Sequence, residues 1–364
     1  MINKLVLENL KHRPVRTALS ALAIGVQVAM VLTLVGLSNG MLADQQGRSR
    51  GVGADILIRA PGSSIIGFTE NMPQKIVDYV RKQPHVALAT GALIAPTGPL
   101  TSVTGLDLPE FSKMSGNFRY IHGGPLQQKN EVIVDEYYAR QNKLHVGDTL
   151  TLLNRPWRLT GIYEPGKIAR IIVDLSVLQD LTSESNKLTV IYVKLDNSSL
   201  TDQMISFFKA HGLHDYKIYS MEAFVSAISV SNLPMLREFI YVVIGIGVIV
   251  GFLVVFLSMY TAVLERTREI GVLKALGASR SMIVGILMRE TTVLAIVGSI
   301  VGIGFSYLTR WVIATLVPGS LIQAIVPVWW PIAGGIAIFG ALLGAAYPGW
   351  KAATQDAIEA LAYD

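Results

Sequence analysis

The sequence predicts a membrane α-helical protein with four transmembrane helices and a large mixed α/β extracytoplasmic domain, which is inserted between helices 1 and 2. Of the 364 residues, 51% are hydrophobic and 16% are charged, against about 25% charged residues in an average soluble chain. The mean hydropathy is +0.46. The apolar residues gather into four long runs, and one long stretch of mixed polarity separates the first run from the second.

Each of the four runs is long enough to cross a membrane. Thr17–Leu42 and Phe239–Leu264 contain no charged residue and exceed the roughly 20 residues that a helix needs to cross the hydrocarbon core. The third run starts with the charge-free residues Thr291–Thr309, and the fourth is Trp329–Tyr347. The first run is far longer than the roughly 7 to 15 apolar residues of a signal peptide, so we expect it to stay attached.

The positions of Lys and Arg predict the orientation of these helices, because short cytoplasmic loops keep positive charge. Basic residues precede the first run and fill the connection between the second and third runs: Lys4, Lys11, Arg13, Arg16, Arg266, Arg268, Lys274, Arg280 and Arg289. The connection between the third and fourth runs offers only Arg310. The sequence therefore predicts a multi-pass protein of the cell (inner) membrane with both termini in the cytoplasm.

These observations divide the chain into nine predicted segments. They are a cytoplasmic amphipathic N-terminal helix (1–16), transmembrane helix 1 (17–42), an extracytoplasmic α/β domain with a stalk (43–236), transmembrane helix 2 (237–264), a cytoplasmic coupling helix (265–282), transmembrane helix 3 (283–316), an outer loop (317–327), transmembrane helix 4 (328–350) and a cytoplasmic tail (351–364). The N-terminal helix has Ile2, Leu5 and Leu10 on one face, which suits the membrane surface. The alternative is a plain cytoplasmic extension of the first span.

The predicted outer domain alternates β-rich runs with turns and short helices. The expected strands are Asp55–Arg59, Val86–Ile94, Glu131–Val134, Thr149–Leu153, Trp157–Ile162, Ile171–Val173 and Thr189–Leu195. The expected helices are Gln74–Lys82, Asp135–Asn142 and Thr201–His211. At the end of the domain, Phe224, Ile228, Leu236 and Phe239 form an approximate stripe, which predicts a stalk helix over Ser220–Phe239 that continues into the second span.

The segment after the second span combines dense charge with an amphipathic pattern. Ile270, Leu273 and Leu276 are predicted to share one helical face, while the charged residues can pair with a partner or with each other, and Gly277 can end the helix. Such a helix can dock in a groove, whereas the alternative is a solvated loop that only carries positive-inside charge. The predicted coupling residues are Glu265, Arg266, Thr267, Arg268, Glu269, Ile270, Gly271, Leu273, Lys274, Leu276 and Gly277.

This segment resembles the cytoplasmic coupling segment of the FtsX-like, or macrolide-exporter-like (MacB-like), ABC transporter permease family. Two other stretches are similar to that family: Asn9–Thr17, at the entry to the first span, and Ala346–Ala353, which is followed by Ile358–Leu361. The order of one helix, a large outer domain and three further helices also matches, so the resemblance covers essentially the whole chain.

The resemblance implies a permease that pairs with a second copy of itself or with a paralogous permease, and that works with a cytoplasmic ABC ATPase. ATP and magnesium would then bind to that ATPase, and membrane lipids and an extracytoplasmic adaptor protein are further expected partners. Two functions stay open. One is the export or extraction of an amphipathic or hydrophobic substrate, and the other is a non-transporting envelope role that regulates an extracytoplasmic enzyme or senses a peptide.

Other chemistry finds little support in the sequence, and we expect no enzyme activity and no cofactor in this chain. A phosphate-binding loop needs a Ser or Thr after its Lys, but the one near-match, from Gly161 to Lys167, is followed by Ile168. Cysteine is absent, and His211 with His214 lacks a further convincing metal ligand. The net charge of +5 follows membrane topology, so no nucleic-acid partner is expected.

Pairs of glycine four residues apart occur in each predicted span. They permit close helix packing, either within one chain or between two chains. The pairs are Gly36/Gly40, Gly247/Gly251, Gly298/Gly302 and Gly340/Gly344.

Overall fold

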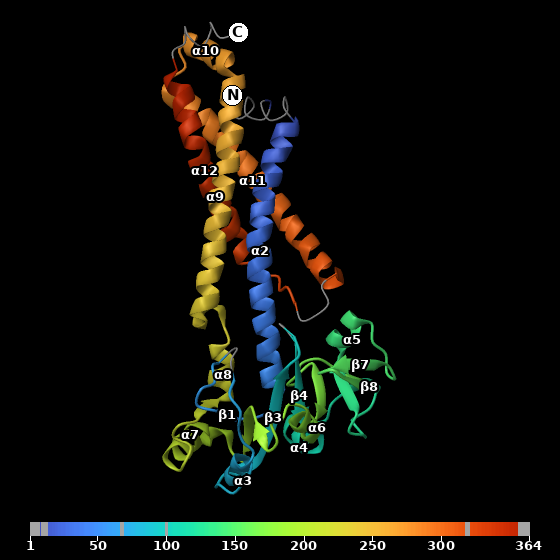
Figure 1. The fold of residues 1–364 in the computed structure, drawn as a ribbon. Coiled ribbons are helices and arrows are strands. Elements are labelled where there is room, and N and C mark those ends of the chain that lie inside the picture. The colour runs from blue at the N-terminus through green and yellow to red at the C-terminus, as the bar shows by residue number, and fades with distance from the viewer. Residues whose placement is uncertain (1–7, 9–13, 66–68, 99–100, 317–320, 356–364) are drawn as a thin grey trace. The chain divides into compact units, whose positions relative to one another are not determined.

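The computed structural model describes residues 8, 14–65, 69–98, 101–316 and 321–355, and it forms two compact units (Figure 1). Unit 1 comprises the described residues up to Asn39, Pro234–Ala314 and those from Gln323 onward; unit 2 comprises those within Gly40–Leu233 and Thr315–Ile322. The predicted N-terminal amphipathic helix and the motif Ile358–Leu361 lie outside the described residues, apart from Glu8 and residues 14–16.

Unit 1 is a bundle of helices (Figure 1). Its described helices are α2 (Pro14–Arg50, of which residues 14–39 belong to this unit), α9 (Pro234–Glu265), α10 (Thr267–Ala275), α11 (Arg280–Leu316, to Ala314 in this unit) and α12 (Trp329–Thr354). Among the described residues, four helices, α2, α9, α11 and α12, are long and apolar enough to cross a membrane. They contain the four predicted runs and extend beyond them, because backbone hydrogen bonds continue past the part of a helix that apolar composition marks.

Close backbone contacts hold α2 against α11. A Cβ atom added at Gly302 would lie 2.5 Å from the carbonyl oxygen of Gly25, and one at Gly298 would lie 2.8 Å from that of Ala21. In the same way, a Cβ atom at Gly344 of α12 would lie 2.7 Å from the carbonyl oxygen of Phe252 in α9. These predicted glycine pairs therefore contribute to packing within one chain.

Polar side chains between the helices of unit 1 bond to each other. The hydroxyl groups of Ser20 in α2 and Ser258 in α9 are 2.6 Å apart, and those of Thr33 in α2 and Thr309 in α11 are 2.8 Å apart. Each hydroxyl thus has a partner inside the bundle, as a polar group away from water requires.

The predicted continuous stalk helix over Ser220–Phe239 is wrong. The structure has strand β12 (Lys217–Ser220), helix α8 (Met221–Ala227) and a short 3₁₀ turn, η2 (Val230–Asn232), before α9 begins at Pro234. Proline lacks a backbone N–H and has its φ fixed near −65°, so it is tolerated in the first turn of a helix and interrupts a helix elsewhere. The apolar stripe is therefore shared between two helices.

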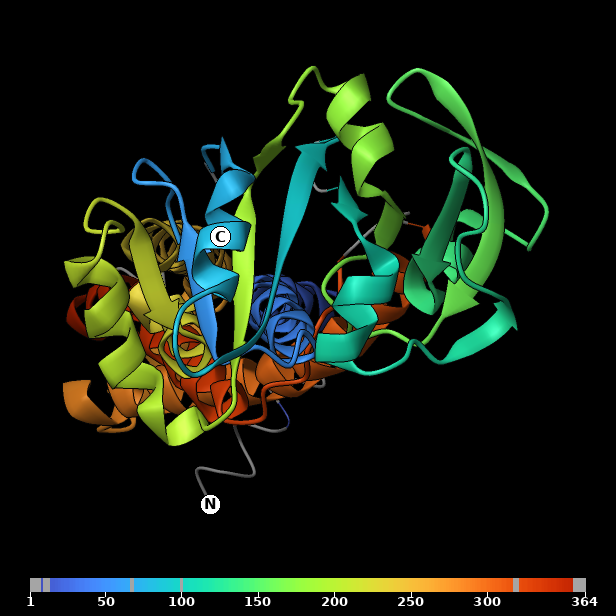
Figure 2. The same cartoon turned by 90° about the horizontal axis from the view of Figure 1, so that it is seen from below.

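Unit 2 is a mixed α/β domain, as the sequence predicts. Within the described residues its main sheet has ten strands, in the order β12-β1-β11-β3-β4-β9-β6-β8-β5, with β7 paired to β8. Figure 2 shows strands and short helices of this domain from below. Neighbours are antiparallel except β4 with β9 and β6 with β8. Besides β12, the strands are β1 (Ile56–Arg59), β3 (Val86–Pro96), β4 (Ser102–Leu106), β5 (Tyr120–Gly123), β6 (Glu131–Asp135), β7 (Thr149–Leu152), β8 (Arg155–Tyr163), β9 (Ile171–Asp174) and β11 (Val190–Leu195).

A two-stranded sheet and short helices complete unit 2. The small sheet pairs β2 (Met72–Pro73) with β10 (Lys187–Leu188). The further helices are α3 (Lys75–Arg81), α4 (Leu108–Ser115), α5 (Glu136–Asn142), α6 (Leu175–Leu181), α7 (Thr201–Ala210) and the 3₁₀ turn η1 (Ser198–Leu200). All seven predicted strands and all three predicted helices of this region are confirmed, whereas β2, β4, β5, β10, β12, α4, α6 and η1 are additional.

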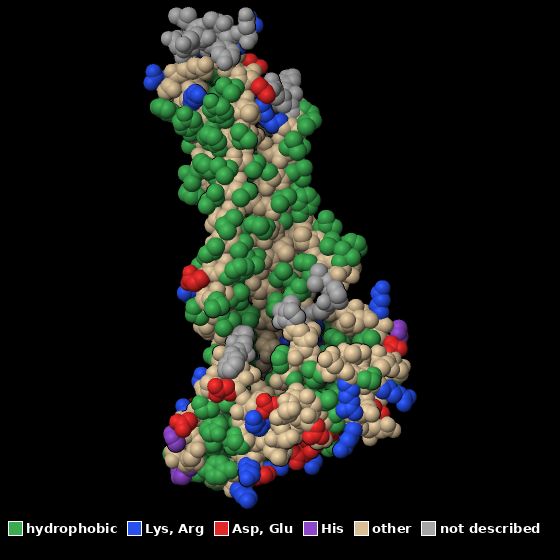
Figure 3. Space-filling model, viewed as in Figure 1, with side chains coloured by type: hydrophobic (Ala, Val, Ile, Leu, Met, Phe, Trp, Pro, Cys, Tyr) green, Lys and Arg blue, Asp and Glu red, His purple; other side chains and the backbone are tan. Residues whose placement is uncertain are grey.

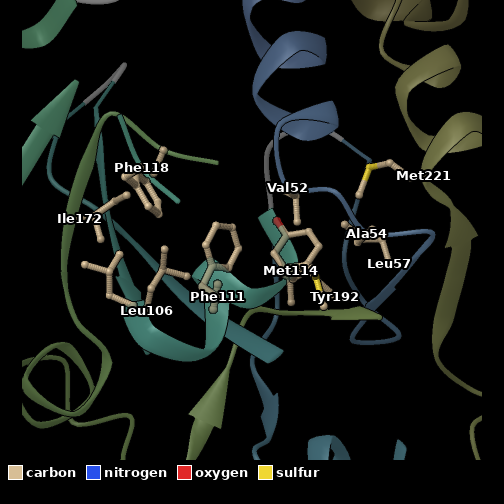
Figure 4. Close-up of a cluster of buried hydrophobic side chains, with 14 of the residues drawn as sticks. Val52, Ala54, Leu57, Leu106, Phe111, Met114, Phe118, Ile172, Tyr192 and Met221 are labelled. Atoms are coloured by element: carbon tan, nitrogen blue, oxygen red, sulfur yellow. The ribbon is translucent and has the colours of Figure 1, made fainter. Parts of the chain in front are cut away.

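The core of unit 2 reaches the residues that directly follow α2. Val52 and Ala54 are buried beside Met114 of α4 and Tyr192 of β11 (Figure 4). Phe111 of α4 is fully buried in the same cluster, and its ring lies 6.4 Å from that of Tyr192. Burial of this apolar surface fixes the point where the chain leaves α2.

A buried ionic cluster holds the end of α2 in unit 2. Asp44 forms an ion pair with Arg48, whose Nε atom lies 3.1 Å from its Oδ2 atom, and accepts a hydrogen bond from Nη2 of Arg170 at 2.9 Å; all three side chains are largely buried. The carboxylate of Asp135, at the end of β6, is also buried and accepts from the backbone N–H of Tyr138 at 2.8 Å. Burial raises the pKa of Asp135 from 3.8 to about 6, although the hydrogen bond from Tyr138 and the charges of Arg170 and Arg48 act in the opposite direction.

The glycine contact predicts the effect of Gly302→Val. The added atoms would collide with the backbone of Gly25, so we expect a loss of about 1–3 kcal/mol in stability. Thermal unfolding of the purified chain in detergent measures this. Gly304→Val is the matched control, because nothing lies within 4 Å of a Cβ atom at that position of the same helix. Equal losses in the two variants would contradict a close α2–α11 contact.

The Asp135 carboxyl predicts a specific pH dependence. Its pKa is raised on folding, so its contribution to stability is fully present below about pH 4 and is lost as the pH rises through about 6. A rise from 3.8 to about 6 corresponds to on the order of 3 kcal/mol. Asp135→Asn retains an acceptor for Tyr138 and cannot ionise, so its stability relative to the wild type should increase from pH 4 to pH 7. A difference that stays constant over this range would contradict the burial of an ionisable Asp135.

Candidate functional site

The short helix α10 contains most of the predicted coupling residues. It follows α9 after the single residue Arg266, whose φ of −111° and ψ of 15° interrupt the helix. Its end confirms the expected role of Gly277, which has a φ of +92°. The N–H of Gly277 donates to Lys274 and that of Ala278 donates to Leu273, each at 3.0 Å. These two bonds form a Schellman motif, which satisfies the last carbonyl groups of the helix.

The predicted common apolar face is divided between the inside and the outside. Ile270 is buried in a small core with Val263, Ile283, Leu287, Ala352 and Ala353. Leu273 is half-buried, whereas Leu276 is 80% exposed. An α-helix turns about 100° per residue, so positions three residues apart drift by about 60° per step, and Ile270 and Leu276 differ by about 120°. The expectation that all three residues face a partner is therefore wrong for Ile270.

Three of the predicted charges bind within the chain. Arg266 pairs with Glu290 of α11, with Nη1 and Oε2 3.3 Å apart and both side chains largely buried. Glu265 at the end of α9 pairs with Arg16 of α2 at 2.5 Å. Lys274 donates from Nζ to the carbonyl oxygen of Gln355, just after α12. Since α10 follows α9 directly, these contacts and the Ile270 core connect this end of all four long helices.

The remaining residues form the outward surface of α10. We call Arg268, Glu269, Val272 and Leu276 the α10 outer face; Val272 is 45% exposed and lies one turn before Leu276. Among the described residues, Arg268 and Glu269 have no ion-pair partner. The eleven predicted residues thus separate into buried, half-buried and exposed sets: Arg266, Thr267, Ile270 and Gly271; Leu273 and Lys274; and Glu265, Arg268, Glu269, Leu276 and Gly277.

The surface of unit 1 separates apolar and charged side chains. Figure 3 shows hydrophobic side chains along the helices, while Lys, Arg, Asp and Glu side chains gather at the end where α10 lies. Sequence reasoning missed Val272 as an exposed residue, and it missed Arg16 and Glu290 as partners. The spacing of Val272, four residues before Leu276, could have indicated that it lies on the exposed face. Arg16 and Glu290 are distant in the sequence from Glu265 and Arg266, so no local pattern indicates these pairs.

The near-match to a phosphate-binding loop has a structural role in unit 2. Gly161 is a residue of β8, and Lys167 donates from Nζ to the carbonyl oxygen of Ser115. Lys167 also lies 5.6 Å from the ring centroid of Phe118. The segment leads into strand β9, whereas a phosphate-binding loop leads into a helix N-terminus. As for metals, the described residues contain no group of three or more His, Asp or Glu side chains that could hold an ion.

Two family descriptions match this chain. The MacB-like periplasmic core domain matches residues 17–206, and the FtsX-like permease C-terminal region matches residues 241–357. The uncharacterized ABC transporter permease YknZ of Bacillus subtilis is 35% identical over 159 residues, which are 42% of this chain and 38% of YknZ. The macrolide export ATP-binding/permease protein MacB of Shigella sonnei is 25% identical over 386 residues, covering 95% of this chain and 58% of MacB.

The chain thus spans roughly half the length of the curated relatives that it matches. Two solved structures are also similar. The periplasmic region of MacB from Actinobacillus actinomycetemcomitans has a TM-score of 0.38 and 16% identity, covering 49% of this chain and 94% of that one. The extracellular domain of YknZ from Gram-positive bacteria has a TM-score of 0.35 and 11% identity, covering 46% and 100%. Both scores are too low to establish a shared fold.

The sequence matches carry the assignment instead. The core-domain description alone covers more than half of the chain, and the permease description covers most of the rest. The four long apolar helices agree with an integral membrane protein. The chain therefore belongs to the MacB-like and FtsX-like family of ABC transporter permeases.

Proposed function

We propose that this chain is the permease subunit of an ABC transporter, and that it couples ATP hydrolysis by a separate cytoplasmic ATPase to motion of unit 2. In this proposal the ATPase, which carries ATP and magnesium, docks on the α10 outer face. The cargo is an amphipathic or hydrophobic substrate, which is exported or extracted at the outer side of the inner membrane. The permease works as a dimer with a second copy or with a paralogous permease.

The observation that carries the proposal is the construction of α10. Its inner side is fixed by the Ile270 core and the buried Arg266–Glu290 pair, while its outer face presents two charges and two exposed apolar side chains. A docking helix needs both features, because the apolar side chains supply burial and the charges fix orientation. A load on α10 would then act on all four long helices.

The charges on α11 support the membrane placement. Arg289 and Arg310 are 21 residues apart (310 − 289), which is about 30 Å along a helix at 1.5 Å per residue. That length equals the thickness of the hydrocarbon core, so Arg289 can reach one membrane interface while Arg310 reaches the other. With α10 on the cytoplasmic side, Arg310 lies at the outer interface and both chain ends are cytoplasmic.

The polar contacts inside unit 1 support a mechanical role over a water-filled pore. Ser20 bonds to Ser258, and Thr33 bonds to Thr309, in each case across two helices. These hydroxyl groups are therefore not available to bind a solute in a pore. α2 then offers a route to the outer domain, because the helix continues from unit 1 into unit 2, where the Asp44 cluster holds it.

The name of MacB refers to macrolide export, and we extend to this chain only the broader class of amphipathic substrates.

The proposed topology predicts the labelling of single cysteines. The chain has no native cysteine, so Ser199→Cys in unit 2 and Ser279→Cys after α10 each introduce one reactive thiol. Both positions are exposed. In intact cells, an impermeant thiol reagent should label position 199 and spare position 279, and permeabilised cells should show both. The reverse pattern would overturn the orientation.

The proposed docking predicts the effect of Leu276→Asp and Val272→Asp. Each variant would place a carboxylate in an apolar contact, and burial of an aliphatic side chain contributes about 1.5–3 kcal/mol. We therefore expect the ATPase to bind the chain roughly 10- to 100-fold more weakly. The amount of ATPase recovered with the purified chain measures this. Glu269→Lys should weaken assembly or uncouple ATP hydrolysis. Expression and membrane insertion should be retained, because these side chains are exposed and point away from the core of the helix bundle.

Ser279→Asp is the matched control for the docking variants. It adds the same carboxylate near α10, and Asp can replace the Ser279 side chain in accepting from the N–H of Met282 at the start of α11. This control should retain the ATPase. Normal recovery and normal substrate-stimulated hydrolysis in all docking variants would show that α10 is only a positively charged connection.

A further inference from the structure

A small pocket lies in unit 1 at the end of α11 that carries Arg310. Side chains from α2, α11, the segment before α12 and the start of α12 line it, among them Val35, Tyr307, Arg310, Gln323 and Trp330. The segment is fixed against α2, because the N–H of Ala324 donates to the carbonyl oxygen of Gly36 at 2.9 Å. A Cβ atom at Gly36 would lie 2.7 Å from the carbonyl oxygen of Ala324, so glycine permits this approach. The pocket is therefore built by tight packing.

Gln323 leaves one strong acceptor unused in this pocket. Its side chain is only 7% exposed, and its Oε1 atom has no hydrogen-bond partner among the described residues. Its Nε2 atom has one long contact, at 3.5 Å, with the carbonyl oxygen of Ser306. An unpaired buried amide oxygen costs about 1–3 kcal/mol, so a donor from outside the chain would relieve this cost.

Arg310 adds a positive charge that none of the described residues neutralises by an ion pair. It is exposed, and no ion pair involves it among the described residues. From Thr291 to Gln355 the sequence contains no Asp or Glu, so α11 beyond Glu290 and the described part of α12 offer no carboxylate. An arginine near a membrane interface is stabilised by the phosphate groups of lipids. An aromatic pair, Tyr307 and Trp330, with ring centroids 6.4 Å apart, lies beside it, and both residue types favour that interface.

The size of the pocket limits the group that can reach Gln323. The enclosed volume is about 20 Å³, which is room for about one water-sized group. A primary ammonium or a hydroxyl group has this size and donates a hydrogen bond, whereas a trimethylammonium group is larger and has no N–H. The phosphate would remain at the mouth with Arg310.

We propose that this pocket is a binding site for the headgroup of an outer-leaflet phospholipid, in which Arg310 binds the phosphate and Gln323 accepts from an adjacent N–H or O–H donor. Phosphatidylethanolamine and phosphatidylglycerol have this chemistry, and phosphatidylcholine lacks the donor. The inference rests on the membrane placement in the proposed function, but it does not depend on ATPase docking.

The test measures lipid retention by the purified full chain without any ATPase. Native mass spectrometry would follow binding of phosphatidylethanolamine, phosphatidylglycerol and phosphatidylcholine, each added to delipidated protein. The wild type should retain the first two several-fold better than the third. Gln323→Leu should abolish this preference, and Arg310→Gln should weaken binding of all three lipids by about tenfold, the size expected for a charged hydrogen bond.

Arg289→Gln is the matched control, because it removes the same charge from the other end of α11. It should retain the headgroup preference. Equal losses in Arg289→Gln and Arg310→Gln, or an unchanged preference in Gln323→Leu, would overturn the proposal. Thermal unfolding without lipid shows whether each variant is folded. If Gln323→Leu is not folded, Gln323→Asn replaces it; its amide is one methylene group shorter, so it should also lose the headgroup preference. Inorganic phosphate should raise the unfolding temperature of the chain less than a phospholipid does. An equal rise would also overturn a lipid site. Failure here combined with the expected Ser199 and Ser279 labelling would leave the proposed function standing.

Discussion

The buried ion pair between Arg266 and Glu290 is the interaction on which the arrangement of unit 1 depends at its α10 end. A charge without a partner in such a place costs several kcal/mol, and removal of one member of a buried pair is more damaging than loss of both. The pair therefore favours one position of the α9–α10 junction relative to α11. Ile270 then enters the core with Leu287 and Ala352. Once these inner contacts are fixed, the helical repeat alone turns Val272 and Leu276 outward.

A different kind of contact holds the helices farther along the bundle. There the backbones of α2 and α11 come close at Gly25, Gly298 and Gly302. In a membrane the hydrophobic effect does not drive helices together, so close packing of this kind and interhelical hydrogen bonds are the main attractive terms. Closely packed interfaces change between discrete arrangements more readily than they deform. A coupling mechanism through this bundle thus requires helices that move as whole bodies.

The sequence predicted most of the fold, because the signals for it are local. Apolar runs longer than a membrane is thick indicated the four long helices, and β-rich runs between turns indicated the central strands of unit 2. The stalk differs from the prediction because its apolar spacing favours one continuous helix, whereas Pro234 begins a new helix. The inner side of α10 could not be predicted, because the partners of Arg266 and Ile270 come from α11 and α12, which the segment's own periodicity does not encode. The same holds for the Asp44–Arg170 pair, whose members are 126 residues apart.

The charges of α11 limit the motions that the proposed coupling can use. Arg289 and Glu290 lie at one end of the apolar part of this helix and Arg310 lies at the other. A shift of α11 along its axis by one turn, about 5.4 Å, would move one of these charged ends towards the hydrocarbon, at a cost of several kcal/mol. Tilting or rotation about the helix axis leaves both ends near the interfaces and has no such cost. The glycine contacts join α2 to α11, so α2 would share this restriction. In the proposed coupling, a signal that passes from α10 to unit 2 through these two helices would therefore travel as a tilt or a rotation.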